Sequence, residues 1–148
     1  MDGVYVVTIL FDAYTNTLNI TGQLQELYDT YSDIIITISQ NIKQRRLPLL
    51  VSGDNIHDFT TDLTNIISKN ENNNIKINTE GSMSMITIVG AYFATFAGLS
   101  GKLFSVLEKN NINIDYLHDD FSKTRISFLC ATQDANNIVN LLHNELVR

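Results

Sequence analysis

The sequence of 148 residues lacks several features that mark whole classes of proteins. Its single cysteine, Cys130, has no partner for an internal disulfide bond. No apolar run approaches the roughly 20 residues that a helix needs to span a bilayer. The N-terminal Met1-Asp2-Gly3 is not a basic segment followed by an apolar one, as a signal peptide requires. These absences predict a cytoplasmic protein with no membrane partner.

Positive charge is also scarce. The chain has 10 lysine and arginine residues against 16 aspartate and glutamate residues, and its formal net charge is −6. The basic residues cluster only at Lys43, Arg45 and Arg46. Because an acidic protein without a larger basic patch repels the phosphate backbone, we expect no nucleic-acid partner. The hydrophobic fraction of 44% is enough to bury a core.

The residue patterns of common catalytic and metal-binding sites are missing as well. The three histidines, His57, His118 and His143, are scattered and have no metal-ligand spacing. There is no Walker-type phosphate loop and no serine-histidine-aspartate arrangement. Cys130 falls in an expected strand with no histidine placed to activate it, which predicts a small buried hydrophobe. We therefore expect no metal, no cofactor and no catalytic residue in this chain.

What the sequence does contain is an internal repeat. Small residues at a helix start, apolar residues on the helix and apolar residues on the next strand recur at an offset of 76 residues. The matched positions are Thr21-Gly22 with Ala97-Gly98, Leu27-Tyr28 with Leu103-Phe104, and Ile36 and Ile38 with Ile112 and Ile114. After the following turn the second copy is expected to be about four residues longer. This repeat predicts two domains, residues 1–80 and 81–148.

Each copy reads as strand, helix, strand, strand, helix, and the first copy adds a fourth strand. In the first copy we expect strands at Val4–Phe11, Ile34–Ser39, Leu47–Val51 and Ile75–Thr79, a helix at Thr21–Tyr31 and a second helix opened by Gly53-Asp54. In the second copy we expect strands at Met83–Val89, Asn113–Leu117 and Thr124–Cys130, a helix at Leu99–Lys109 and a last helix opened by Thr132 or Asp134. This order predicts an α+β protein of two ferredoxin-like units, each an antiparallel sheet with helices on one face.

The loops from first strand to first helix are the candidate binding sites. They are residues 12–20 and 90–97, and each leads to a helix start at a glycine. A helix N-terminus presents free N–H groups and a partial positive charge, so it suits a carboxylate. Asp115, which we expect at the end of a neighbouring strand, offers an acceptor for an ammonium group, and Ser39 stands at the matching place in the first copy. The alternative is that both glycines only ease tight turns.

The second copy also resembles a known family. The residues that carry the resemblance are Met85-Ile86-Thr87-Ile88-Val89-Gly90, Ala97-Gly98-Leu99-Ser100-Gly101-Lys102-Leu103-Phe104, Ile112-Asn113-Ile114-Asp115, Lys123-Thr124-Arg125-Ile126-Ser127-Phe128-Leu129, Asp134 and Leu141-Leu142-His143-Asn144-Glu145-Leu146. They are similar to the last ACT domain of aspartokinases. The first copy has the position, length and element order of the penultimate ACT domain, with Gly22 on the family's helix-start glycine. It departs from the family at residues 37–40, where an aspartate is usual.

The resemblance implies a regulatory role. Aspartokinases phosphorylate the β-carboxylate of aspartate with ATP, the entry to lysine, threonine and methionine, and their kinase domain precedes the ACT pair. Nothing here resembles its Lys-Phe-Gly-Gly opening, so the chain is expected to be a non-enzymatic regulatory fragment or subunit that partners that kinase domain. A homodimer binding lysine, or threonine as second choice, is implied. The implied effector residues are Asn19, Ile20, Gly22, Gln23, Leu24, Thr37, Ile38 and Ser39, with Thr95, Gly98, Leu99, Asn113, Ile114 and Asp115 of a partner's second copy.

The family also accounts for the strand that the second copy lacks. In aspartokinases the second ACT domain borrows its fourth strand from chain just upstream of the first domain. Here only Met1–Gly3 precede the first strand. We therefore expect the first strand of the second copy to be an open edge, prone to pairing with another chain.

Other functions of the fold remain as alternatives. The module could serve only to dimerise, without a ligand. An RNA-recognition motif needs aromatic residues on a basic sheet face, and residues 125–130 offer only Phe128. Acylphosphatases have an arginine in the first loop, and neither loop here contains one.

Overall fold

The computed structural model describes residues 1–12, 17–38, 45–69, 74–90, 98–118 and 124–146. Its elements follow the order β1 (Val4–Leu10), α1 (Thr17–Thr30), β2 (Ile35–Ile38), β3 (Arg46–Ser52), α2 (Ile56–Ser68), β4 (Lys76–Val89), α3 (Leu99–Lys109), β5 (Tyr116–His118), β6 (Arg125–Ala131) and α4 (Ala135–Leu146). Short 3-10 turns, η2 (Gly53–Asn55) and η4 (Thr132–Asp134), precede α2 and α4. Across these described ranges no helix is both long enough and apolar enough to cross a membrane.

The chain divides into two compact units, which are treated separately below. The first repeat is Gly3–Ser82, and the second repeat is Met1–Asp2 together with Met83–Arg148. β4 runs through both, because its residues before Met83 belong to the first repeat and the rest to the second.

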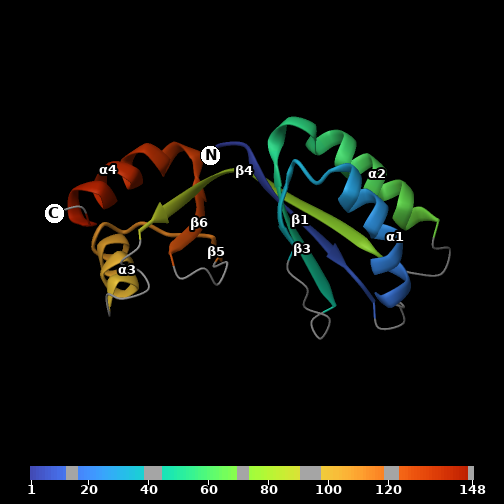
Figure 1. Ribbon diagram of the computed structural model, residues 1–148, viewed down its shortest axis with the longest axis horizontal. Coiled ribbons are helices and arrows are strands. Elements are labelled where there is room, and N and C mark those ends of the chain that lie inside the picture. The colour runs from blue at the N-terminus through green and yellow to red at the C-terminus, as the bar shows by residue number, and fades with distance from the viewer. Residues whose placement is uncertain (13–16, 39–44, 70–73, 91–97, 119–123, 147–148) are drawn as a thin grey trace. The chain divides into compact units, whose positions relative to one another are not determined.

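The first repeat is a sheet with two helices on one face. Its strand order is β2-β3-β1-β4, and the pairs β1–β3 and β2–β3 are antiparallel. Helices α1 and α2 lie side by side on the sheet (Figure 1). The core between the layers is built from alternate strand residues and from one face of each helix. It contains Val7, Ile9, Leu24, Leu27, Leu49, Val51, Phe59 and Leu63.

The second repeat repeats this plan with three strands in the order β4-β6-β5. The β4–β6 and β5–β6 pairs are antiparallel. Helices α3 and α4 cover the sheet (Figure 1). Its separate core contains Ile86, Leu103, Val106, Leu107, Phe128, Cys130, Ile138 and Leu142. The expected α+β fold of two ferredoxin-like units is confirmed.

Equivalent positions of the two repeats are 79 residues apart in the strand pairings and in the cores, so the expected offset of 76 is wrong. The pairs Val4↔Ser52 and Met83↔Ala131 start equivalent strand ladders, and Leu10↔Arg46 and Val89↔Arg125 end them. The same offset joins the core residues Leu24 and Leu103, Leu49 and Phe128, Phe59 and Ile138, and Leu63 and Leu142. It also joins η2 to η4, so the second copy is not longer. Matching Gly22 to Gly98 misled the sequence comparison, because the true counterpart of Gly22 is Gly101.

One strand replaces two at the junction of the repeats. The sequence predicted separate strands that end at Thr79 and begin at Met83, but β4 is continuous through Gly81. A glycine in such a segment reads as a break. In the structure it lies against the ring of Tyr5, and a Cβ at Gly81 would overlap that ring.

On the edge of the second repeat formed by β4, the backbone of Met1 pairs with that of Met85. The N-terminal amine of Met1 donates to Met85 O at 3.0 Å, and Met85 N donates to Met1 O at 2.7 Å. Such an exchange is the closely spaced pair of an antiparallel ladder. The backbone groups of Thr87 and Val89 point to the same side, and the described residues provide no strand beside them. Among the described residues this repeat has three strands, as expected, but the edge that was expected to be open is paired at Met85 with Met1.

Candidate functional site

The start of α3 has the geometry that the sequence predicted. Gly98 precedes the helix in a left-handed conformation, with φ +90° and ψ 1°. A Cβ there would meet nothing within 4 Å, so the backbone angle and not the space calls for glycine. Gly98 O accepts the first helical hydrogen bond, from Lys102 N, at 2.9 Å. The first turn carries no acidic side chain, which leaves the partial positive charge of the helix N-terminus uncompensated from within α3.

The start of α1 differs from the prediction. The helix begins at Thr17 and not at Thr21, so Gly22 lies inside it, exposed, with open space around its Cα. The side chains of Ile20 and Leu24 are 1% and 0% exposed and belong to the core. Gln23 is exposed, and the side chain of Asn19 lies outside the described residues.

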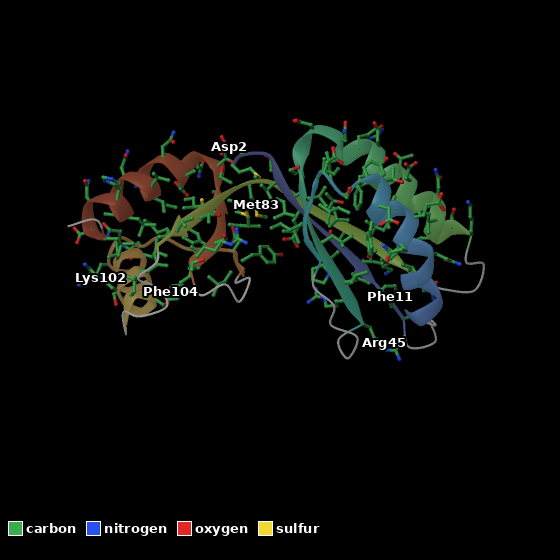
Figure 2. The ribbon with its side chains drawn as sticks, in the orientation of Figure 1. Asp2, Phe11, Arg45, Met83, Lys102 and Phe104 are labelled. Carbon is green, nitrogen blue, oxygen red and sulfur yellow. The ribbon has the colours of Figure 1, made fainter. Side chains whose placement is uncertain are left out.

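Hydrogen bonds join three segments of the first repeat at the end of its sheet from which α1 starts. Phe11 N donates to Arg45 O at 2.9 Å, and Arg45 Nη1 donates to Asp12 O at 2.6 Å. Asn74 N donates a hydrogen bond to Asp12 Oδ2, with 3.4 Å between the two atoms. Phe11 and Arg45 lie close together at this end of β1 and β3 (Figure 2). These contacts tie Asp12 to Arg45 and Asn74 and place the Arg45 guanidinium beside Asp12.

Arg45 is a residue whose role the sequence did not reveal. It stood out only as one of three basic residues in an expected turn. Its φ of +52° lies in the left-handed region, which is unusual for arginine. The contact with Asp12 joins residues 33 apart in sequence, so no local pattern predicts it.

The remaining predicted residues of the first copy lie at the end of β2. Thr37 and Ile38 are its last residues, and β2 runs back toward the end where α1 starts. Their side chains, Ser39, and Thr95 of the second copy lie outside the described residues.

The predicted residues of the second copy are not brought together. Gly98 and Leu99 open α3, whereas Asn113, Ile114 and Asp115 follow its other end. An 11-residue helix separates the two groups, roughly 16 Å at 1.5 Å per residue. Asp115 also precedes β5 and does not end it, which corrects the prediction.

The 79-residue offset also changes which residue of the first copy corresponds to Asp115. Its counterpart is Ile36 and not Ser39, which corresponds to His118. Ile114 packs against the core of the second repeat, whereas Asn113 and Asp115 are exposed. The position that is Asp115 in the second copy is thus the hydrophobic Ile36 in the first copy.

The prediction of a buried Cys130 is confirmed. His57 and His143 are exposed, and the side chain of His118 lies outside the described residues. Cys130 is 1% exposed, and burial raises the pKa of its thiol. Within the described part of the chain, no group of three or more histidine, cysteine or acidic residues is placed to hold a metal ion.

The second repeat is similar to a known family. The family model for the ACT domain matches residues 86–146, which is less than half of the chain. Over 71 residues the chain is 31% identical to the aspartate kinase FUB3 of Gibberella moniliformis, an alignment that covers 48% of this chain and 14% of that protein. The chain therefore spans a small part of that relative.

Solved structures extend the likeness to both repeats. The aspartate kinase of Clostridium acetobutylicum aligns with a TM-score of 0.77 at 18% identity, covering 97% of this chain and 33% of that one. The regulatory subunit of aspartate kinase from Thermus flavus aligns with a TM-score of 0.73 at 14% identity, covering 98% and 94%. The chain thus has the fold of the regulatory domains of aspartate kinase.

Proposed function

We propose that this chain is the amino-acid-sensing regulatory region of an aspartate kinase, with a first ACT domain in residues 1–80 and a second in 81–148. The match of residues 86–146 to the family model for the ACT domain carries the proposal. The relative named above is an aspartate kinase, and a regulatory subunit of such an enzyme has the same two-unit fold over nearly its whole length. Feedback control of aspartate phosphorylation is then its role, and the kinase domain is its partner.

The effector site of this proposal lies at the α1-start end of the first repeat. The α-carboxylate of an amino acid is placed at the helix N-terminus, where free N–H groups and the helix dipole attract an anion. Arg45 adds a full positive charge, because its guanidinium lies beside Asp12 and donates a hydrogen bond to Asp12 O. The α3 start at Gly98, contributed by a partner chain, offers a second set of free N–H groups. The effector thus binds where two copies of the chain meet.

Regulation then follows from linkage. Two chains pair across a two-fold axis, and the effector favours one arrangement of the pair. Its influence on the kinase equals its difference in affinity for the two states, about 1–3 kcal/mol in typical cases. Lysine is the first candidate effector and threonine the second.

Ile36, which replaces the acid found at Asp115, favours a second function for the module, dimerisation without a ligand.

Calorimetric titration of the purified chain with lysine, threonine and methionine tests the proposal, with light scattering before and after each addition. We expect saturable heat from one of them at about one site per chain. Arg45→Ala should weaken that binding about tenfold, because it removes a charged hydrogen-bond donor. Arg46→Ala is the matched control, since Arg46 is exposed one residue further along and should leave affinity unchanged. A folded dimer that gives no heat with any of the three would support the ligand-free module instead.

A further inference from the structure

All three methionines of the sequence lie at one place in the second repeat, where the N-terminal segment meets β4. They are Met1, Met83 and Met85, and all belong to the same compact unit. Asp2 and Met83 lie close together at this junction (Figure 2), and Asp2 bonds to Ser84, the next residue of β4. The expectation that the chain holds no metal rested on its histidines and its cysteine, and thioether sulfur is a different class of ligand.

The pairing of the two segments puts the three thioethers on one face of the sheet. Met83 and Met85 are two residues apart in β4, so their side chains point the same way, at a spacing of roughly 7 Å. Met1 and Met85 exchange two backbone hydrogen bonds, so their side chains also share a face, with about 5.5 Å between the Cα atoms. This register places Met1 diagonally to Met83, at roughly 7–8 Å. Methionine side chains can bridge such spacings, because each has three rotatable bonds.

The face with the thioethers is the one opposite the helices of the second repeat. Ser84 and Ile86 alternate with the methionines of β4 and are 1% and 8% exposed on the other face. Cys130 pairs with Ser84 in the β4–β6 ladder and belongs to the core with Ile86, so its thiol is not among the sulfur atoms of this cluster. Met1 is 65% exposed, and the other two methionines are partly exposed. An ion can therefore reach the thioethers from solvent.

The strand itself does not require methionine at these positions. At the 79-residue offset, Met83 and Met85 correspond to Val4 and Val6, which have the same places in the β1–β3 ladder. Valine suits a strand, because its branched Cβ packs well on a pleated surface. The second repeat replaces both valines by flexible side chains that carry sulfur, and it places Met1 beside them.

The neighbouring side chains on this face offer no competing charged ligand. Ala131 and Leu129 stand opposite the two methionines of β4 in the β6 ladder. In the next row, Thr87 Oγ1 and Ser127 Oγ lie 2.9 Å apart and bond to each other. The N-terminal amine donates to the backbone of β4. The surroundings thus favour an ion that binds uncharged sulfur over one that needs carboxylate oxygen.

We infer that Met1, Met83 and Met85 form a binding site for a soft monovalent metal ion, copper(I). Thioether sulfur is a soft donor, and soft donors select copper(I) over magnesium, calcium or manganese, which prefer oxygen. Three such donors on two neighbouring segments can close on one ion. The site uses none of the residues of the proposed effector site, so either proposal can fail without the other.

NMR titration of protein labelled with ¹³C at its methionine methyl groups tests the inference. The spectrum has one methyl signal for each of the three methionines, and copper(I) kept reduced with ascorbate under nitrogen is the probe. We expect all three signals to shift together and to stop changing at one ion per chain. Silver(I), which is soft and does not change its oxidation state here, should reproduce the shifts. Zinc, which binds thiolate, imidazole and carboxylate, should not.

Conservative variants separate the thioethers from the thiol. Losing a group that only orients a metal ligand typically costs about 10–100-fold in affinity, so Met83→Leu and Met85→Leu should each weaken binding at least about tenfold. Leucine keeps the volume of methionine, and unchanged amide spectra away from β4 will show that the variants are folded. Cys130→Ala is the matched control, since it removes the single thiol and should leave the affinity unchanged. Competition with bicinchoninate measures each affinity.

Four results would overturn the inference. Copper(I) could leave the methyl signals unchanged, or the three signals could saturate independently of one another. Either leucine variant could bind copper(I) as tightly as the parent chain. Cys130→Ala could lose the binding, which would assign it to the thiol.

Discussion

The main chains of Met1 and Met85 exchange two hydrogen bonds, although 84 residues separate them. The pair anchors the N-terminus on the free edge of β4 in the second repeat. Directly beside it, Ser84 Oγ donates to the Asp2 carboxylate at 2.5 Å and lies 3.1 Å from Thr132 Oγ1. Ser84 is 1% exposed, so its hydroxyl depends on these partners. The second repeat is therefore contacted at the start of its edge strand by two residues that precede the first repeat.

Replacing Asp2 should destabilise the protein through Ser84. Asp2→Ala removes the acceptor of a buried hydroxyl, and we expect the free energy of unfolding to fall by about 1–3 kcal/mol. Denaturant unfolding measures the change. In a double-mutant cycle with Ser84→Ala, the cost of Asp2→Ala should largely disappear, because the hydroxyl that needs the acceptor is gone. Equal costs in both backgrounds would show that the bond contributes nothing.

Gly22 and Gly98 should respond in opposite directions to substitution by alanine. Gly22 lies inside α1 with free space around it, so Gly22→Ala should raise the free energy of unfolding by roughly 0.5–1 kcal/mol. Gly98 has a φ of +90°, so Gly98→Ala should lower it by about 1–2 kcal/mol. Thermal unfolding of both variants measures the pair. If Gly22→Ala destabilised the protein as Gly98→Ala does, Gly22 would stand at a helix start after all.

Gly81 should tolerate a side chain only if Tyr5 is reduced. A Cβ at Gly81 overlaps the Tyr5 ring, so Gly81→Ala is expected to cost about 1–3 kcal/mol of stability. In a Tyr5→Ala background the same substitution should cost clearly less. Chemical denaturation of the four proteins of this cycle measures the coupling. An unchanged cost would mean that the ring is not what requires the glycine.

Tyr31 links α1 to α2 in a way that depends on pH. Its hydroxyl donates to Asp62 Oδ2 at 2.7 Å, and this bond, more than burial or charge, raises the Tyr31 pKa from 10.0 to about 12. Because the folded-state pKa is the higher one, the contribution to stability is complete below about pH 10. It is lost as the pH rises from 10 toward 12.

Spectroscopic titration of the phenol groups tests this link. Asp62→Asn should bring the Tyr31 pKa down toward 10.0, because it removes the carboxylate that accepts the hydrogen bond and leaves only burial and the charge of Asp58 to oppose ionisation. Tyr28 is the internal control, since burial alone raises its pKa to about 12. The variant should leave Tyr28 unchanged. A Tyr31 pKa that stays near 12 in Asp62→Asn would contradict the assignment.

Much of the fold could be predicted from local patterns. Apolar residues at helical spacing, such as Phe59 and Leu63, correctly marked the core face of α2. Alternating and β-branched runs marked the strands, because a strand buries every second residue. The helix-start glycine of the second copy was also correct, since only a backbone with positive φ requires glycine there.

The errors came where distant residues decide the structure. The continuity of β4 through Gly81 was missed, and the ring of Tyr5 that lies against this glycine comes from a strand far from it in sequence. The offset of 76 followed two glycines, whereas the cores that define 79 form only when helices pack on strands. The contacts of Arg45 and the pairing of Met1 with Met85 join residues that are far apart in sequence. Periodicity carries no signal for such contacts.

The dimer dissociation constant with and without effector tests the central claim most directly. Sedimentation equilibrium should be run on the chain alone and with saturating lysine, threonine or methionine. If the effector binds where two chains meet, one of these amino acids should shift the dissociation constant about 5- to 150-fold, and dimer formation should change its affinity by the same factor. A dissociation constant that none of them changes would contradict the account of this chain as an effector-linked regulatory dimer.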